Sequence, residues 1–129
     1  MAFSGQLGHG SPLQAEVKAL MLGLSLCCQE GFVLSQVETD SQILHKSFHG
    51  SSSIPWSIHY ITRACRGMIS NNTSVTHTWR EGNKVADHPA SLDVPGPDHF
   101  GFHTTSSMKP KGVNLVRGDA LGFHYFRPP

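Results

Sequence analysis

Residues 11–20, Ser-Pro-Leu-Gln-Ala-Glu-Val-Lys-Ala-Leu, have the pattern of the beginning of an amphipathic helix. Ser11 suits the N-cap, Pro12 suits the first helical position, and Gln14 completes a capping box. Apolar residues then recur at three- and four-residue steps and form one stripe, namely Leu13, Val17, Leu20, Leu24 and Cys27. Gly31 ends the helix. The stripe predicts that this helix packs against a sheet.

Segments on both sides of this helix have the pattern of strands. Residues 2–7 alternate weakly between apolar and polar types and end at the turn Gly8-His9-Gly10. Residues 32–39, Phe-Val-Leu-Ser-Gln-Val-Glu-Thr, form a more apolar run that ends at Asp40. A strand so rich in Val and Leu is expected to have neighbours on both sides.

Further helices and one more strand complete the pattern. Asp40-Ser41 can cap a short helix that continues to about His45. Another helix begins near Pro55, and its apolar stripe is Ile54, Ile58, Ile61, Cys65 and Met68. Residues 74–80 alternate as a strand, and Asn83 can cap a last helix through Ala90. This alternation of strands and helices predicts an α/β fold.

Length and composition favour one small domain followed by an extension. The chain has 129 residues, of which 38% are hydrophobic, so it can build one core. From Asp93 onward Pro and Gly recur every few residues, which predicts loops and short turns. We therefore divide the chain into a domain at 1–92 and a Gly/Pro-rich C-terminal extension at 93–129.

Charge, cysteine content and hydropathy exclude several classes of protein. A net charge of +1 provides no global attraction for a polyanion, so nucleic acid would have to bind at a local patch. Three cysteines without a repeated spacing argue against a disulfide framework. We find neither a signal-peptide pattern nor an apolar run of about 20 residues. We therefore expect a soluble intracellular protein, in the cytoplasm or the nucleus.

Three carboxylates are candidates for chemistry, and two of them, Glu16 and Asp40, also have an alternative structural explanation. Glu16 lies beside the apolar stripe, where it is either partly desolvated or a boundary residue whose carboxylate reaches solvent. Asp40 follows the end of a strand, where sites of α/β sheets collect, or else it is an N-cap. Asp87 lies within a helix, where aspartate has low propensity and no capping role.

These carboxylates would form a metal site if they converged. Clustered carboxylates repel one another unless a divalent cation neutralises them, and oxygen ligands favour Mg²⁺ or Mn²⁺. Two such ions about 3.5–4 Å apart would stabilise the attacking and leaving oxygens of a phosphodiester. The spacing of Glu16, Asp40 and Asp87 along the chain does not by itself establish this convergence.

Three segments of the chain resemble a known family. They are residues 11–20, Val37-Glu38-Thr39-Asp40-Ser41, and Arg80-Glu81-Gly82-Asn83-Lys84-Val85-Ala86-Asp87. In this order they resemble the signatures of type 1 ribonuclease H-like domains, and most closely the plant group related to non-LTR retroelement reverse transcriptases. The match covers about residues 2–92. In addition, Gly118-Asp119-Ala120-Leu121-Gly122 resembles a C-terminal extension of that plant group.

The resemblance implies a mixed sheet flanked by helices and a nuclease that cuts the RNA strand of an RNA–DNA hybrid. Four acidic residues of the family hold two Mg²⁺ ions, and Glu16, Asp40 and Asp87 match the second, third and fourth. Water activated on one ion would attack the phosphate, while the other ion would stabilise the departing 3′ oxygen. Arg63, Arg66 and Lys84 are candidates for nucleic-acid phosphate contacts, or else they belong to solvated helix faces.

The chain departs from the family's pattern in two places. It begins at what resembles the third strand, so we expect it to lack the first two strands and the first acidic ligand. Pro89 follows Asp87 closely, and it either costs about 3 kcal/mol inside the helix or makes the helix end early. We therefore expect impaired catalysis, and an exposed sheet edge that favours self-association or pairing with residues 93–129. Three functions stay open: a hybrid-specific ribonuclease, a non-catalytic nucleic-acid or protein interaction module, and a partial gene product.

Overall fold

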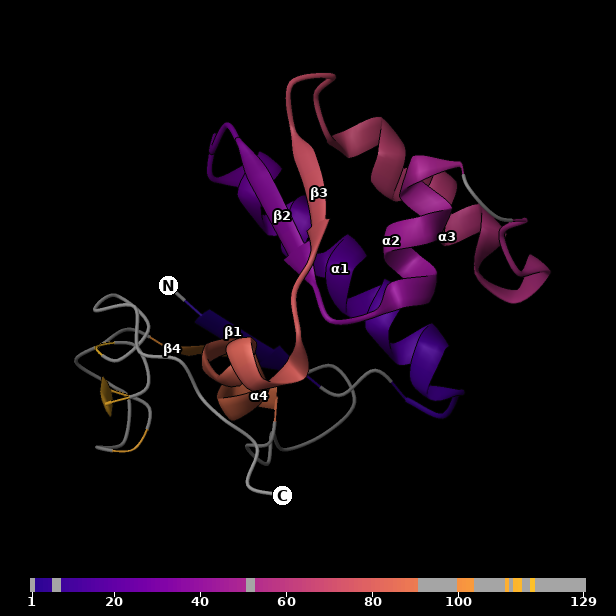
Figure 1. The fold of residues 1–129 in the computed structure, drawn as a ribbon. Coiled ribbons are helices and arrows are strands. Elements are labelled where there is room, and N and C mark those ends of the chain that lie inside the picture. The colour runs from indigo at the N-terminus through magenta and orange to yellow at the C-terminus, as the bar shows by residue number, and fades with distance from the viewer. Residues whose placement is uncertain are drawn as a thin grey trace. The chain divides into compact units, whose positions relative to one another are not determined.

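The computed structural model describes residues 2–5, 8–50, 53–90 and 100–103, together with 111, 113, 114 and 117. The elements shown in Figure 1 are β1 (Ala2–Gly5), α1 (Pro12–Gln29), β2 (Gln36–Thr39), α2 (Gln42–His49), α3 (Trp56–Met68), β3 (Ser74–His77), the 3-10 helix η1 (Arg80–Gly82), α4 (Lys84–Ala90) and β4 (Phe100–His103). The chain divides into two compact units. We call His9–His77 the central unit and Met1–Gly8 with Thr78–Pro129 the terminal unit.

Helix α1 forms as the sequence predicts. The Ser11 hydroxyl accepts from the Gln14 backbone N–H, and the Gln14 side chain accepts from the Ser11 N–H, so the capping box is complete. After the C-cap residue Glu30, Gly31 takes a φ of 73°, a left-handed conformation that costs glycine little. These signals are local in sequence, and the structure confirms them.

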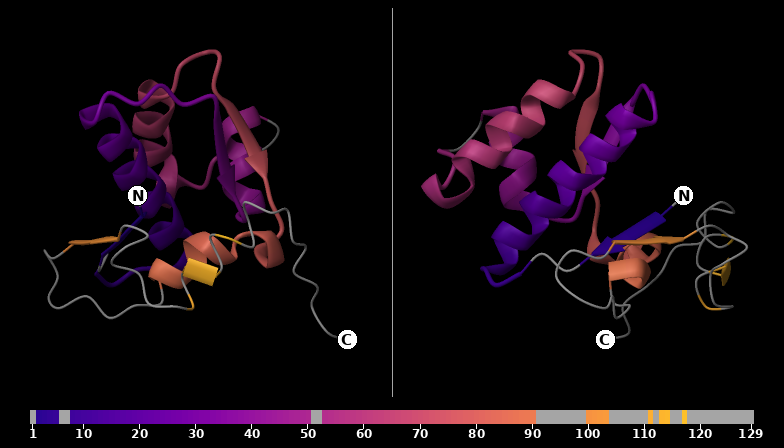
Figure 2. Two further views of the ribbon diagram at one scale, coloured as in Figure 1. Left: turned by 90° about the vertical axis from the view of Figure 1, so that its left-hand side faces the viewer. Right: turned by 180° about the vertical axis from the view of Figure 1, so that it is seen from behind.

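The helices α1 and α3 lie side by side on one side of strands β2 and β3, as Figure 2 shows. The Ser25 hydroxyl of α1 lies 3.6 Å from the Met68 sulfur at the end of α3. Three fully buried side chains form the core between helices, Val17 of α1, Leu44 of α2 and Ile58 of α3. Partly buried apolar residues pack around them: Leu13, Leu20, Ile54 and Ile61. The predicted stripes of α1 and α3 therefore supply this core.

The strands β2 and β3 pair in parallel, from Gln36 opposite Ser74 to Thr39 opposite His77. β2 begins four residues later than the sequence predicted, because Phe32-Val33-Leu34 have no partner strand in the described part of the chain. The side chains of Phe32 and Val33 are accordingly 58% and 91% exposed, whereas Leu34 is half-buried. The predicted self-association through a sheet edge stays a prediction.

The terminal unit contains a strand that the sequence analysis missed. β4 (Phe100–His103) pairs antiparallel with β1, from Ala2 opposite His103 to Gly5 opposite Phe100, and α4 packs against β1. The prediction of loops and turns throughout 93–129 is therefore wrong at this strand. The segment 118–122 lies outside the described residues, and the domain boundary at residue 92 stays a prediction.

Helix α4 includes Pro89, so of the two alternatives that the sequence left open for this proline, an early end of the helix is wrong. α4 extends to Ala90, so Pro89 is its penultimate residue. A proline has no backbone N–H, so it cannot donate a hydrogen bond to the preceding turn. Because only one residue of the helix follows Pro89, few backbone hydrogen bonds of the helix are affected. In the described residues no helix is both long and apolar enough to cross a membrane.

Candidate carboxylate site

Asp40 occupies the carboxyl end of β2, one residue after Thr39, and is half-buried. The N-cap of α2 is the next residue, since the Ser41 hydroxyl accepts from the Leu44 N–H at 3.5 Å. The Thr39 hydroxyl accepts from the Ser41 N–H at 3.1 Å and fixes the turn between strand and helix. The explanation of Asp40 as an N-cap is therefore wrong. Its position at the end of a parallel strand is one where sites of α/β folds collect.

Glu16 lies in the second turn of α1 and is half-buried. It precedes the fully buried Val17, and it shares a helix face with Leu13 and Leu20, three residues before it and four after it. Both leucines pack against the core, so the Glu16 stem lies at the edge of apolar packing. Such an environment restricts the side-chain conformations of Glu16 more than a fully solvated helix face would.

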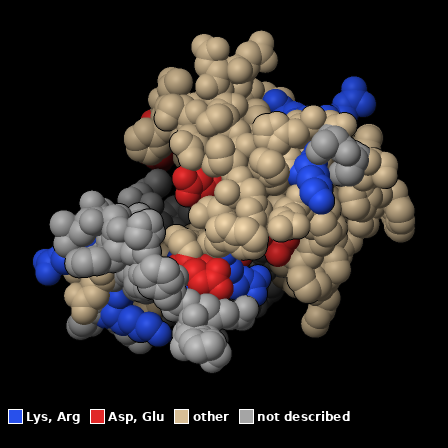
Figure 3. Space-filling view, in the orientation of Figure 1, with Lys and Arg blue, Asp and Glu red and all other residues tan. Residues whose placement is uncertain are grey.

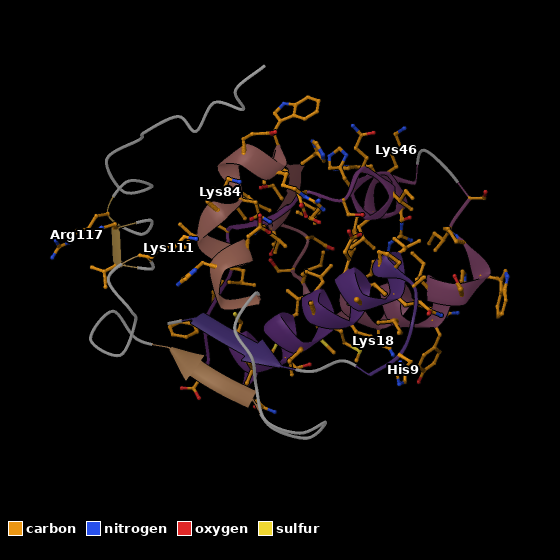
Figure 4. All side chains as sticks on the ribbon, turned by 90° about the horizontal axis from the view of Figure 1, so that it is seen from below. His9, Lys18, Lys46, Lys84, Lys111 and Arg117 are labelled. Carbon is orange, nitrogen blue, oxygen red and sulfur yellow. The ribbon has the colours of Figure 1, made fainter. Side chains whose placement is uncertain are left out.

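Asp87 belongs to the terminal unit, where it is half-buried in α4. The backbone N–H groups of Ala86 and Asp87 both donate to the Asn83 carbonyl, at 3.1 and 3.0 Å. Asn83 thus begins the helix as expected of a capping position. One turn before Asp87 lies Lys84, labelled in Figure 4, which is also half-buried.

The oxygen donors of these residues suit a hard cation. Glu16 and Asp40 belong to the central unit and Asp87 to the terminal unit. Among the residues that the structure describes, no three His, Cys, Asp or Glu side chains gather as a metal-binding group. Carboxylates are nevertheless the ligands that Mg²⁺ prefers, and Mg²⁺ often takes only one or two of them from a protein. The convergence of the three carboxylates stays a prediction.

The basic candidates have different surroundings. Arg63 is exposed on α3. Arg66, also exposed, donates from Nη2 to the Ser47 carbonyl, and its guanidinium lies 5.9 Å from the centre of the Phe48 ring. Arg66 therefore links α3 to α2 through these two contacts. Contacts of Arg63, Arg66 and Lys84 with phosphate stay predictions.

The sequence analysis missed a group of three histidines at the junction of α2 and β3. The ring centres of His45 and His49 are 4.5 Å apart, and those of His45 and His77 are 6.1 Å apart. His49 Nε2 lies 2.8 Å from the Val75 carbonyl oxygen, a hydrogen bond between α2 and β3. The four-residue spacing of His45 and His49 would have predicted their contact, but His77 joins them only through the fold.

We expect the stability of the protein to fall on mild acidification because of His45. Desolvation lowers the pKa of His45 below its ordinary value of 6.5, and the nearby charges of His49, His77 and Lys46 lower it further. The folded state favours the neutral imidazole of His45. The contribution of His45 to the free energy of unfolding is therefore fully present above pH 6.5 and is lost as the pH falls below that value. Urea unfolding at pH 7.5 and 5.5 measures this change, and His45→Gln should reduce it. An unchanged pH dependence in that variant would contradict the assignment to His45.

The chain is similar to known proteins along most of its length. A family model described as "Reverse transcriptase-like" matches residues 1–92. A protein of Arabidopsis thaliana named "Putative ribonuclease H protein" is 25% identical over 122 residues, which make up 93% of this chain and 19% of that protein. The chain thus spans about a fifth of the length of that relative.

A solved structure agrees with this similarity. The crystal structure of RNase H1 from the halophilic archaeon Halobacterium salinarum matches with a TM-score of 0.60 and 26% identity, over 65% of this chain and 66% of that chain. The described residues match it as a mixed α/β arrangement with two parallel strands and four α-helices. Because the family model covers more than half of its residues, this chain belongs to the Reverse transcriptase-like family of ribonuclease H-like domains.

Proposed function

We propose that this chain is a nucleic-acid-binding domain of the RNA–DNA hybrid ribonuclease family, with β2 and β3 as strands of that family's mixed sheet. The observation that carries the proposal is the position of Asp40. It follows a parallel strand, and the cap of the next helix is supplied by Ser41 instead. Glu16, half-buried at the edge of the core, and Asp87 of α4 complete the proposed ligand set.

In this proposal Glu16, Asp40 and Asp87 would hold Mg²⁺ or Mn²⁺. Ions held there would supply a water nucleophile of lowered pKa and would stabilise charge on the departing 3′ oxygen. The chain's own groups set the geometry, because the Thr39–Ser41 hydrogen bond fixes the backbone on both sides of Asp40. Arg63, Arg66 and Lys84 are the proposed contacts to the phosphates of the hybrid.

We expect the chain to bind a hybrid in a Mg²⁺-dependent way but to cut it slowly. It offers three of the four carboxylates that the resemblance implies, and Mg²⁺ binds weakly to an incomplete set of ligands. The function of a binding module without catalysis is therefore a second candidate. Cleavage of a labelled RNA strand distinguishes the two, and robust turnover that Asp87→Asn abolishes would show that catalysis is intact.

Binding is measured by fluorescence anisotropy of a labelled RNA–DNA hybrid, titrated with protein in Mg²⁺ or in chelator. Asp40→Asn should remove most of the Mg²⁺ effect, weakening binding in Mg²⁺ by about tenfold, since it removes a charged ligand. Glu38→Gln is the matched control, because Glu38 is exposed on the same strand and its Oε1 accepts from Gln36 Nε2 at 2.7 Å. Equal Mg²⁺ effects in both variants would refute the site.

A further inference from the structure

One face of α3 combines exposed aromatic and basic side chains. Trp56 is 91% exposed and Tyr60, one turn later, is 83% exposed. His59 and Arg63 are exposed on the same face, since a helix places residues three, four and seven apart on one side. The opposite face of α3 is buried through Ile58, Thr62 and Cys65. The core therefore holds α3 in an orientation that leaves this face open to solvent.

The segment of the chain that carries this face lacks acidic residues. Residues 41–77 contain no aspartate or glutamate, whereas they contain Lys46, Arg63 and Arg66. In Figure 3 the charged atoms visible over α2 and α3, at the upper right, are blue. Although the net charge of the chain is only +1, residues 41–77 therefore carry an excess of positive charge. The complementary partner is a polyanion.

We propose that the exposed face of α3 binds single-stranded nucleic acid, with bases stacked on Trp56 and Tyr60 and a phosphate bound by Arg63. Removing the faces of exposed aromatic rings from water is favourable in free energy, and an unpaired base offers a flat surface of matching size on which they can stack. An arginine seven residues after the tryptophan lies on the same side of the helix and reaches the phosphate backbone. In a double helix the bases are already stacked, so a duplex cannot use these rings in this way.

Charge and shape disfavour two other occupants of this face. A second copy of the chain packed face to face would place Arg63 near its own copy, and like charges repel. An anionic membrane would attract the face, but the apolar side of α3 is already buried in the core and cannot enter lipid. Each alternative is an outcome of the experiment below. The proposal does not depend on Glu16, Asp40 or Asp87.

The experiment measures binding of a labelled single-stranded oligonucleotide to the full chain in chelator, so that the carboxylate site contributes nothing. We expect Trp56→Ala to weaken binding about tenfold and the double variant Trp56→Ala/Tyr60→Ala about a hundredfold. Arg63→Lys should weaken it less than Arg63→Ala, because the charge remains. Phe32→Ala, which removes an exposed aromatic of the same unit, should change affinity less than about twofold. The circular dichroism of all variants should match the unmodified chain, since these side chains are exposed.

Three results would overturn the proposal. The first is equal affinity of the double variant and the unmodified chain for the oligonucleotide. The second is equally tight and equally Trp56-dependent binding of heparin, a polyanion without bases. The third is a Trp56-dependent dimer in light scattering, or Trp56-dependent binding to phosphatidylserine vesicles, in place of oligonucleotide binding. Loss of single-strand binding with retained Mg²⁺-dependent hybrid binding would support this proposal and leave the carboxylate site intact.

Discussion

Replacing Ile58 by alanine is expected to destabilise the central unit by about 2–5 kcal/mol, as for other large-to-small changes in protein cores. Ile58 is fully buried and shares the core with Val17 of α1 and Leu44 of α2. Its removal leaves a cavity at the point where three helices meet, and the fixed backbones of those helices limit its collapse. Since small domains are stable by only about 5–15 kcal/mol, the variant could lose much of its folded population at 37 °C.

Ile43→Ala is the matched control, because Ile43 is 48% exposed on α2 and the chemical change is the same. Its cost should stay below about 1 kcal/mol. Urea unfolding followed by circular dichroism gives both values from the shift in midpoint. Similar midpoints for the two variants would mean that the helices do not share the core described above.

Replacing Thr62 by valine is expected to stabilise the protein. Thr62 is fully buried, and within the described part of the chain its hydroxyl has no hydrogen-bond partner. A buried hydroxyl without a partner costs about 1–3 kcal/mol, whereas valine has nearly the same shape and no polar atom. We expect a gain of about 1 kcal/mol or more, which corresponds to a rise in Tm of about 4–8 °C for a unit of this size.

A second threonine provides the opposite result. The Thr73 hydroxyl donates to the Leu34 carbonyl at 2.8 Å and links the loop before β3 to the segment before β2. Thr73→Val removes this bond, so it should destabilise by about 1 kcal/mol. Differential scanning calorimetry measures both variants. A lower Tm for Thr62→Val would show that its hydroxyl has a partner, such as water, in solution.

Elements whose signals are local were predicted well from the sequence. α1 needed only Ser11, Pro12, Gln14 and Gly31, all of which act within a turn of their own position. α2 was predicted too short, because the prediction did not use Gly50, a local signal that takes a φ of 70° and ends the helix after His49. α3 and α4 were also predicted correctly as helices. The spacing of apolar residues predicted α3, the capping residue Asn83 predicted α4, and both signals are local in sequence.

Strands and sites depended on neighbours that the sequence does not display. Phe32 and Val33 have strand-like character, yet a strand requires a partner, and these residues have none in the described chain. β4 was missed because its partner β1 lies at the other end of the chain. Partial desolvation was one of the two explanations that the sequence left open for Glu16, and the half-burial of Asp40 was not predicted. The meeting of His77 with the histidines of α2 likewise required the fold.

The order of the two units along the chain constrains how the protein folds during synthesis. The central unit is continuous, so all of its strands and helices have been made before residue 78 leaves the ribosome. β1 is synthesised before the central unit, yet its pairing is complete only after His103 has been made. A folded central unit would hold His9 and His77 at a fixed separation, which shortens the loop that β1 and β4 must close and lowers its entropic cost. β1 therefore precedes the central unit along the chain but meets its partner strand later than the central unit can fold, and until then β1 is an unpaired strand open to other chains.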